Sequence, residues 1–226
     1  VRQPGTHPLV RVVQVFLFAA FLVGIYFLCA GSLMPAWGYI FFLIYFAFNL
    51  AMVLSAGEAL LKERATRHAD SVPWDRYLSL VGILPLMLIL AVGGLDWRYG
   101  WSPILPLWVN LLSAGIMVTC LAINTWAVSS NPFYSNVVRI QSERGHRVVD
   151  TGPYARLRHP TYAMGLILFI VQPLLLGSLW ALIPGALGMI ALVARTALED
   201  RTLKAGLAGY AEYTHRVRYR LIPGIW

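Results

Sequence analysis

The sequence predicts an all-α fold, a polytopic membrane helix bundle with four full spans and a C-terminal helical hairpin. Of the 226 residues, 58% are hydrophobic and only 12% are charged. Soluble domains carry about 25% charged residues, so this chain has roughly half of what a water-facing surface requires. Lipid requires no such polar cover, and this length suits one membrane domain of about five to seven helices.

Four apolar runs are each close to the roughly 20 residues that a helix needs to cross the hydrocarbon core. They cover residues 10–30, 36–57, 77–95 and 106–128. A fifth apolar region, 162–195, is long for one crossing and short for two, and Gly177-Ser178 interrupts it. We therefore predict a tight hairpin there, with short arms that do not each reach the far surface. The chain thus divides into N-terminal transmembrane helices, 1–128, and a second region, 129–226, that contains the hairpin.

The lysines and arginines predict the orientation of the bundle. All of the 18 except Arg98 lie near the start of the first run, between the second and third, between the fourth and the hairpin, or from the end of the hairpin onward. Even numbers of crossings separate these segments, so they share one face, which the positive-inside rule makes cytoplasmic. We expect an integral membrane protein with both termini in the cytoplasm. This topology and anionic headgroups account for the net charge of +8, so we predict no nucleic-acid partner.

Two polar segments, residues 129–161 and 195–226, are where chemistry could occur. Gly152-Pro153 predicts a turn, and Pro160 predicts the start of a helix whose N–H groups could hold an anionic group. Arg195 and Glu199 lie four residues apart, hence on one helix face. Taken alone, that pair is also typical of a solvated ion pair at a membrane boundary.

Other polar and aromatic residues are less informative. Tyr210 and Tyr213 are three residues apart, a spacing that an aromatic belt at the membrane interface also explains. Polar residues within spans usually bond between helices, although Asn124 or Gln172 could line a substrate pocket. The following histidines show no metal-ligand spacing, so we interpret them as surface residues and predict no metal: His7, His68, His146 and His215.

Two motifs occur in order with the membrane hairpin between them. The first is Gly152-Pro153-Tyr154 followed by Arg158-His159-Pro160-Thr161-Tyr162 and Gly165. The second is Arg195, Glu199-Asp200, Tyr210, Tyr213 and Arg220-Leu221-Ile222-Pro223. Together they resemble the isoprenylcysteine carboxyl methyltransferase and phospholipid methyltransferase superfamily. The resemblance covers roughly the last 80 residues, from Gly145 onward.

The resemblance implies a membrane methyltransferase that uses S-adenosylmethionine, bound beneath a cytoplasmic cap that the C-terminal segments form. It implies cofactor contacts by Tyr154, Arg158, His159, Pro160, Tyr162, Gly165, Glu199 and Asp200. We predict catalytic roles for Arg195, Glu199 and Arg220. An arginine would orient a carboxylate acceptor, whereas Glu199 would remove the proton of an amine acceptor. Whether Glu199 acts as a base or only binds the cofactor stays open.

The sequence does not choose the methyl acceptor. An isoprenylcysteine carboxylate, a phospholipid amine and a small thiol all suit a lipidic or small-molecule site beside a methyl donor. The short chain without organelle features favours a prokaryotic plasma membrane. Two alternatives remain: an NADPH-dependent membrane reductase related to sterol reductases, which are usually longer, and a non-catalytic lipid-binding membrane module.

Overall fold

The computed structural model describes residues 8–55, 72, 74–75, 83–135 and 137–226, with only the backbone at 8–16 and 53–55. This part of the chain contains seven α-helices, two short 3-10 turns and no β-strand. In chain order the elements are α1 (Pro8–Ala30), α2 (Ala36–Ser55), α5 (Leu84–Tyr99), α6 (Leu107–Ser130), η2 (Ser142–Arg144), η3 (Gly152–Ala155), α7 (Pro160–Leu175), α8 (Leu182–Gly206) and α9 (Tyr210–Arg216).

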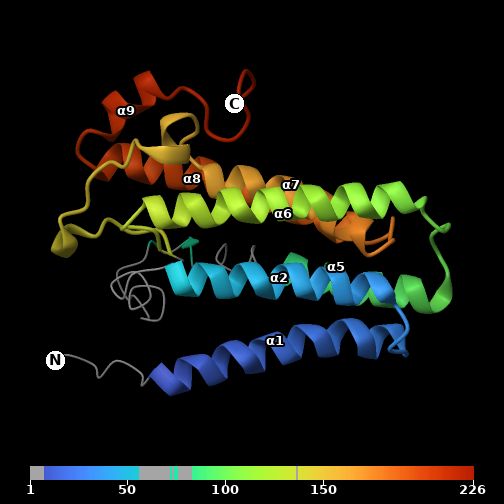
Figure 1. Ribbon diagram of the computed structural model, residues 1–226. Helices are drawn as coiled ribbons and strands as arrows, with labels where there is room; N and C mark the ends of the chain where they lie inside the picture. The colour runs from blue at the N-terminus through green and yellow to red at the C-terminus, as the bar shows by residue number, and fades with distance from the viewer. Residues whose placement is uncertain (1–7, 56–71, 73, 76–82, 136) are drawn as a thin grey trace.

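The long helices lie side by side and run in roughly one direction (Figure 1). The connections from α1 to α2, from α5 to α6 and from α7 to α8 lie at one end of the bundle. The segment from α6 to α7 and helix α9 gather at the other end. Arg98, in the last turn of α5, is thereby separated from the arginine-rich segments, as the charge pattern predicts.

Two helices, α6 with 24 residues and α8 with 25, are long and apolar enough to cross a membrane. Shorter apolar helices cover Leu17–Ala30, Ala36–Met52 and Pro160–Leu175. Large apolar side chains on the helices are exposed, for example Leu28 at 79% and Leu187 at 60%. Such exposure is expected where helices face lipid instead of water. The four full spans and the cytoplasmic cap stay predictions.

The predicted hairpin is present. Helix α7 ends at Leu175, α8 begins at Leu182, and Gly177 in the turn between them has a φ of +79°. The prediction of short arms suits α7, with 16 residues, but is wrong for α8, with 25. Helix α8 continues past Arg195 because residues 196–205 are mostly good helix formers.

The boundaries of the predicted third span differ from those of α5. Residues 77–82 of that prediction lie outside the described residues. At its other end, α5 continues past residue 95 to Tyr99. It ends where Gly100 takes a left-handed φ of 62° and donates its N–H to the Asp96 backbone carbonyl at 2.7 Å. Glycine adopts this conformation without steric cost, so the helix ends there instead of where the apolar run ends.

Buried polar contacts join the loops at the end of the bundle opposite α9. Asp96, 3% exposed, accepts hydrogen bonds from the Ser102 backbone N–H at 2.7 Å and the Ser102 hydroxyl at 2.5 Å. It also accepts one from the Ser178 hydroxyl in the α7–α8 turn. Asn110 of α6 donates to two backbone carbonyls at the end of α7, each at 3.1 Å. The bond between helices predicted for polar residues within spans is therefore confirmed for Asn110.

Candidate active site

A pocket lies among the α6–α7 segment, the start of α7, the end of α8 and helix α9. Its cavity volume is about 100 Å³ and it opens to solvent, so it is smaller than the roughly 300–1,000 Å³ of typical small-molecule sites. Five of the predicted cofactor residues line it, namely Tyr154, Arg158, His159, Tyr162 and Glu199. The fold thus brings residues from both sequence motifs to one cavity.

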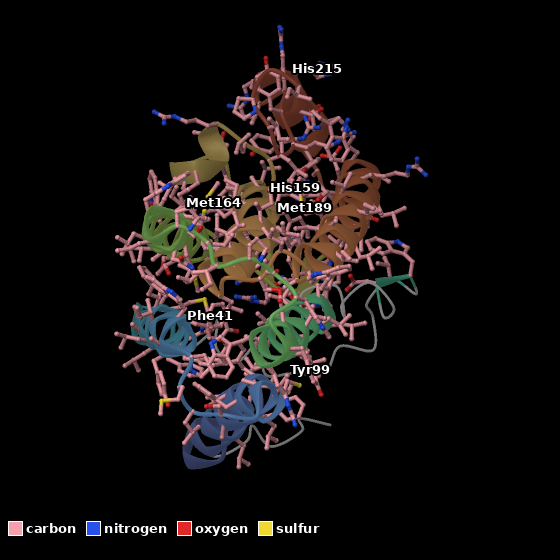
Figure 2. The ribbon with its side chains drawn as sticks, turned by 90° about the vertical axis from the view of Figure 1, so that its right-hand side faces the viewer. Phe41, Tyr99, His159, Met164, Met189 and His215 are labelled. Carbon is pink, nitrogen blue, oxygen red and sulfur yellow. The ribbon has the colours of Figure 1, made fainter. Side chains whose placement is uncertain are left out.

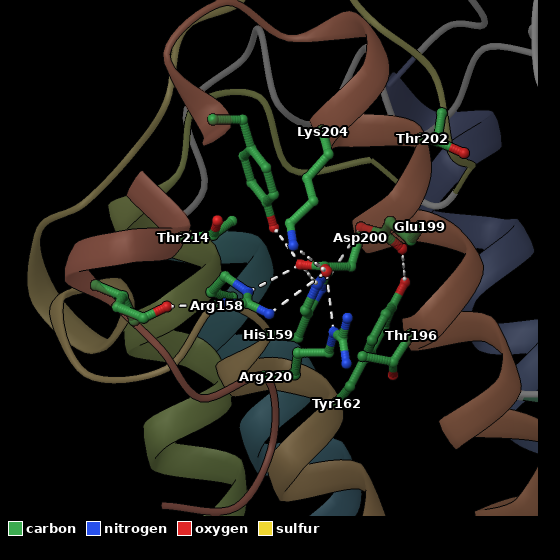
Figure 3. A network of polar contacts seen from close by, with 12 residues as sticks. Arg158, His159, Tyr162, Thr196, Glu199, Asp200, Thr202, Lys204, Thr214 and Arg220 are labelled. Carbon is green, nitrogen blue, oxygen red and sulfur yellow. Dashed lines mark hydrogen bonds and ion pairs between the residues drawn. The ribbon is translucent and has the colours of Figure 1, made fainter. Parts of the chain in front are cut away.

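The start of α7 and the end of α8 meet at one wall of this pocket. His159 is the N-cap of α7 and Pro160 is its first residue, as predicted. The His159 and Tyr162 rings stack, with centroids 5.6 Å apart and planes 2° apart. The Tyr162 hydroxyl donates a hydrogen bond to Glu199 Oε2 at 2.6 Å, and His159 Nδ1 lies 3.9 Å from Glu199 Oε1 (Figure 3). A carboxylate is therefore fixed beside the positive end of the α7 dipole.

Asp200, the neighbour of Glu199, occupies a different environment. Its side chain is 1% exposed, and the residue does not line the pocket. One of its oxygens lies 2.8 Å from Arg158 Nε and the other 2.9 Å from Arg220 Nε (Figure 3). The Tyr210 hydroxyl donates to it at 3.1 Å. Asp200 therefore joins α8 to the start of α7, to α9 and to the C-terminal segment, and its direct contact with a cofactor stays a prediction.

The C-terminal segment pairs with the chain just before α7. The backbone N–H groups of Arg158 and His159 donate to the carbonyls of Tyr219 and Arg220, each at 3.0 Å. Arg220 is bound by Asp200, and its guanidinium lies 4.7 Å from the centroid of the Trp226 ring. Arg220 does not line the pocket. Its predicted catalytic role therefore stays a prediction.

Tyr210 and Tyr213 are core residues of this end of the bundle, 4% and 1% exposed. The Tyr213 hydroxyl donates to the Tyr154 carbonyl at 2.6 Å, in the turn that Gly152-Pro153 predicted. Burial raises the pKa of Tyr154, Tyr210 and Tyr213 above the ordinary tyrosine value, so their hydroxyls stay protonated at neutral pH. The alternative of an interfacial aromatic belt is wrong for this pair, because both rings pack inward.

Arg195 lies on α8 one helical turn before Glu199 and does not line the pocket. Its guanidinium carbon lies 5.8 Å from the centroid of the Tyr162 ring. Its Nη2 lies 2.9 Å from Oδ1 of Asp75, a residue that is 0% exposed. The reading of Arg195 and Glu199 as a solvated helix end does not suit Arg195, which is 8% exposed. Asp75 was not among the predicted site residues, since it is one of several acidic residues in a segment of mixed charge and has no distinguishing spacing.

Two predicted cofactor residues, Pro160 and Gly165, do not line the pocket and have a role in packing. Pro160 begins α7, is buried and does not line the pocket. A Cβ added to Gly165 would lie 3.0 Å from Leu192 Cδ2, so this glycine permits close packing of α7 against α8. Asn124 and Gln172, which could have lined a substrate pocket, line neither of the pockets found in the described residues.

The segment between α6 and α7 contributes pocket residues that the motifs did not indicate. His146 lines the pocket and stacks on Phe133, with ring centroids 4.7 Å apart. Its Nδ1 accepts a hydrogen bond from the Gln141 backbone N–H at 3.2 Å. Burial, together with the charges of Arg139 and Arg144, lowers the pKa of His146, which favours the neutral ring. The interpretation of His146 as a surface residue is therefore wrong.

The other three histidines that we interpreted as surface residues do not contradict that interpretation. His215 projects from the outer edge of the molecule (Figure 2) and is exposed, as predicted. His7 and His68 lie outside the described residues.

The family comparison agrees with this geometry. The model of the isoprenylcysteine carboxyl methyltransferase (ICMT) family matches residues 111–205. This region of the chain is similar to the ICMT family. The match begins within α6, earlier than the motifs indicated, and ends before α9. No curated protein matches the chain.

The similarity to the ICMT family indicates a methyltransferase. The matched region contains the start of α7 and most of α8, and hence His159, Tyr162, Arg195 and Glu199. Asp75, α9 and the C-terminal segment lie outside it, although all three contact site residues. Segments on both sides of the matched region thus help to form the site.

Proposed function

We propose that the chain is an integral membrane methyltransferase that uses S-adenosylmethionine and binds it in the pocket between α7, α8 and α9. The observation that carries the proposal is the Glu199 carboxylate, which lines the pocket beside the stacked His159 and Tyr162 rings. A fixed carboxylate at a pocket wall suits a ligand that carries an ammonium group. The similarity of residues 111–205 to the ICMT family supports methyl transfer as the chemistry.

The residues of the pocket suit the three parts of this cofactor. Glu199 would bind the ammonium group, whereas His159 and the start of α7 would bind the carboxylate. The Nε2 of His159 is buried and lies 3.6 Å from Asp200 Oδ1, so this carboxylate helps to fix the orientation of the ring. Tyr154 and Tyr162 would pack on the adenosine. When bound, the cofactor supplies an electrophilic methyl group on its sulfonium.

Alignment and exclusion of water are what this chain would contribute to methyl transfer, because the reaction is an in-line displacement. For a carboxylate acceptor, Arg195 or Arg220 would have to leave its partner, since Arg195 pairs with Asp75 and Arg220 with Asp200, each at 2.9 Å. For an amine acceptor, Glu199 is the candidate base. The hydrogen bond from the Tyr162 hydroxyl holds the Glu199 carboxylate in one orientation.

An apolar groove supports a lipidic acceptor. Leu111 and Cys120 of α6 and Met164 and Ile167 of α7 line an open hollow of about 530 Å³. Met164 is one turn beyond the start of α7, where the pocket residues lie (Figure 2). The groove could therefore hold the hydrocarbon part of an acceptor whose head reaches the methyl donor. We further propose a prokaryotic plasma membrane as the location, with both termini in the cytoplasm.

Titration of the purified, detergent-solubilised protein with S-adenosylmethionine and, in parallel, with NADPH tests the cofactor. We expect saturable heat of binding for S-adenosylmethionine and none for NADPH, because Glu199 is placed for an ammonium group and NADPH has none. Binding of NADPH alone would replace the proposal with a membrane reductase. Binding of neither would favour a non-catalytic lipid-binding module.

A further inference from the structure

A buried carboxylate from outside the matched region reaches the candidate active site. Asp75, from the segment between α2 and α5, is 0% exposed. Its Oδ1 lies 2.9 Å from Arg195 Nη2, and its Oδ2 accepts a hydrogen bond from the Val138 backbone N–H at 2.8 Å. The Val72 N–H donates to the Val138 carbonyl at 3.2 Å. Asp75 therefore contacts helix α8 and, at Val138, the wall of the pocket.

Arg195 lies between this carboxylate and that of Glu199. Residues four apart lie on the same face of a helix, so the Arg195 guanidinium can reach towards Glu199. It also lies against the ring of Tyr162, whose hydroxyl donates to Glu199. A buried guanidinium is strongly destabilising without a carboxylate partner. In the structure Asp75 supplies one at 2.9 Å, while Glu199 remains at the pocket wall.

We propose that Asp75 is a positioning residue that holds Arg195 away from Glu199 and so keeps the Glu199 carboxylate available to a cationic ligand. The inference rests on the proposed function, in which that cation is the ammonium group of the methyl donor. Without the Asp75 charge, Arg195 turns to Glu199, the carboxylate one turn along the same face of α8, and competes with the ligand. Asp75 thereby controls cofactor affinity although it does not line the pocket.

The first test measures the dissociation constant of S-adenosylmethionine for the wild type, Asp75→Asn, Arg195→Gln and the double variant. Asparagine keeps the volume of Asp75 and an oxygen for the Val138 N–H, but removes the charge. We expect Asp75→Asn to weaken binding about tenfold or more, and the double variant to recover affinity within about threefold of the wild type, because the competing cation is gone. A merely structural role of Asp75 would not produce this recovery.

Asp150→Asn is the matched control. It breaks the exposed pair with Arg216, which has the same 2.9 Å separation, and we expect no change in affinity. Unchanged affinity in Asp75→Asn, or a double variant as weak as Asp75→Asn, would overturn the inference. If Asp75→Asn does not fold, the comparison is between the double variant and Arg195→Gln, which must bind equally. A weaker double variant in that comparison would also overturn it.

A second test needs no ligand. Glu199→Gln is made in the wild type and in Asp75→Asn, and the loss of melting temperature is compared in the two backgrounds. We expect a larger loss in Asp75→Asn, where Arg195 depends on Glu199, and additive losses would contradict the inference. A wild type that binds no S-adenosylmethionine but shows this coupling would reject the proposed function alone. A wild type that binds it with additive losses would reject only the role of Asp75.

Discussion

Replacing Glu199 with Gln should weaken S-adenosylmethionine binding by about 1.5–3 kcal/mol, roughly 10- to 100-fold, because a charge-assisted hydrogen bond is lost. Glutamine preserves the shape of the side chain and can still accept the hydrogen bond from the Tyr162 hydroxyl, 2.6 Å from Glu199 in the wild type. The change therefore removes the negative charge and little else. Calorimetric titration of the two proteins measures the difference.

The control for this prediction is Glu212→Gln. Glu212 lies exposed in the first turn of α9 and does not line the pocket. We expect this variant to bind the cofactor as the wild type does. Equal affinities in Glu199→Gln and the wild type would remove Glu199 from the cofactor site, and an equal loss in both variants would indicate a general effect of charge.

Replacing Asp200 with Asn should cost about 3–5 kcal/mol in the free energy of unfolding, because it leaves buried arginine charge without a carboxylate. The Arg158 side chain is 5% exposed and depends on Asp200 at 2.8 Å. Arg220, with a side chain 26% exposed, loses the same partner. Denaturation of the detergent-solubilised protein, monitored through the unfolding of the C-terminal region, measures the loss of unfolding free energy.

Asp150→Asn gives the matched comparison for stability. The Arg216–Asp150 pair is as short as the Arg220–Asp200 pair, 2.9 Å, but its side chains are 66% and 40% exposed. Exposed ion pairs contribute about 0–1 kcal/mol, so we expect a change within that range. Similar losses in Asp200→Asn and Asp150→Asn would contradict the role of Asp200 as the buried link between α7, α8 and the C-terminal segment.

Local sequence signals predicted the elements of the C-terminal half well. Pro160 marks the start of α7 because proline suits the first turn of a helix. Gly177 marks the hairpin turn because its backbone takes a positive φ. The resemblance then identified His159, Tyr162 and Glu199, which the fold brings to one pocket wall. The helix start, the hairpin turn and the motif residues each depend on residues that are close in sequence or on a shared motif, so the sequence alone can predict them.

Contacts between distant segments could not be predicted in this way. Asp96 meets Ser178 across 82 positions of sequence, and Asp75 meets Arg195 from a different part of the chain. Neither acid differs from a surface residue by composition or spacing. Tyr210 and Tyr213 illustrate the same limit, because a three-residue spacing suits both an interfacial belt and a buried face. The packing of α9 against α8 decides between them.

Photo-cross-linking of radiolabelled S-adenosylmethionine to the solubilised wild type, followed by identification of the labelled peptides, tests the central claim most directly. We expect the label on peptides that contain the pocket residues Tyr154, Tyr162 or Glu199, reduced by unlabelled S-adenosylmethionine and unaffected by NADPH. Label elsewhere in the chain, or label that NADPH removes, would contradict a methyl-donor site between α7, α8 and α9.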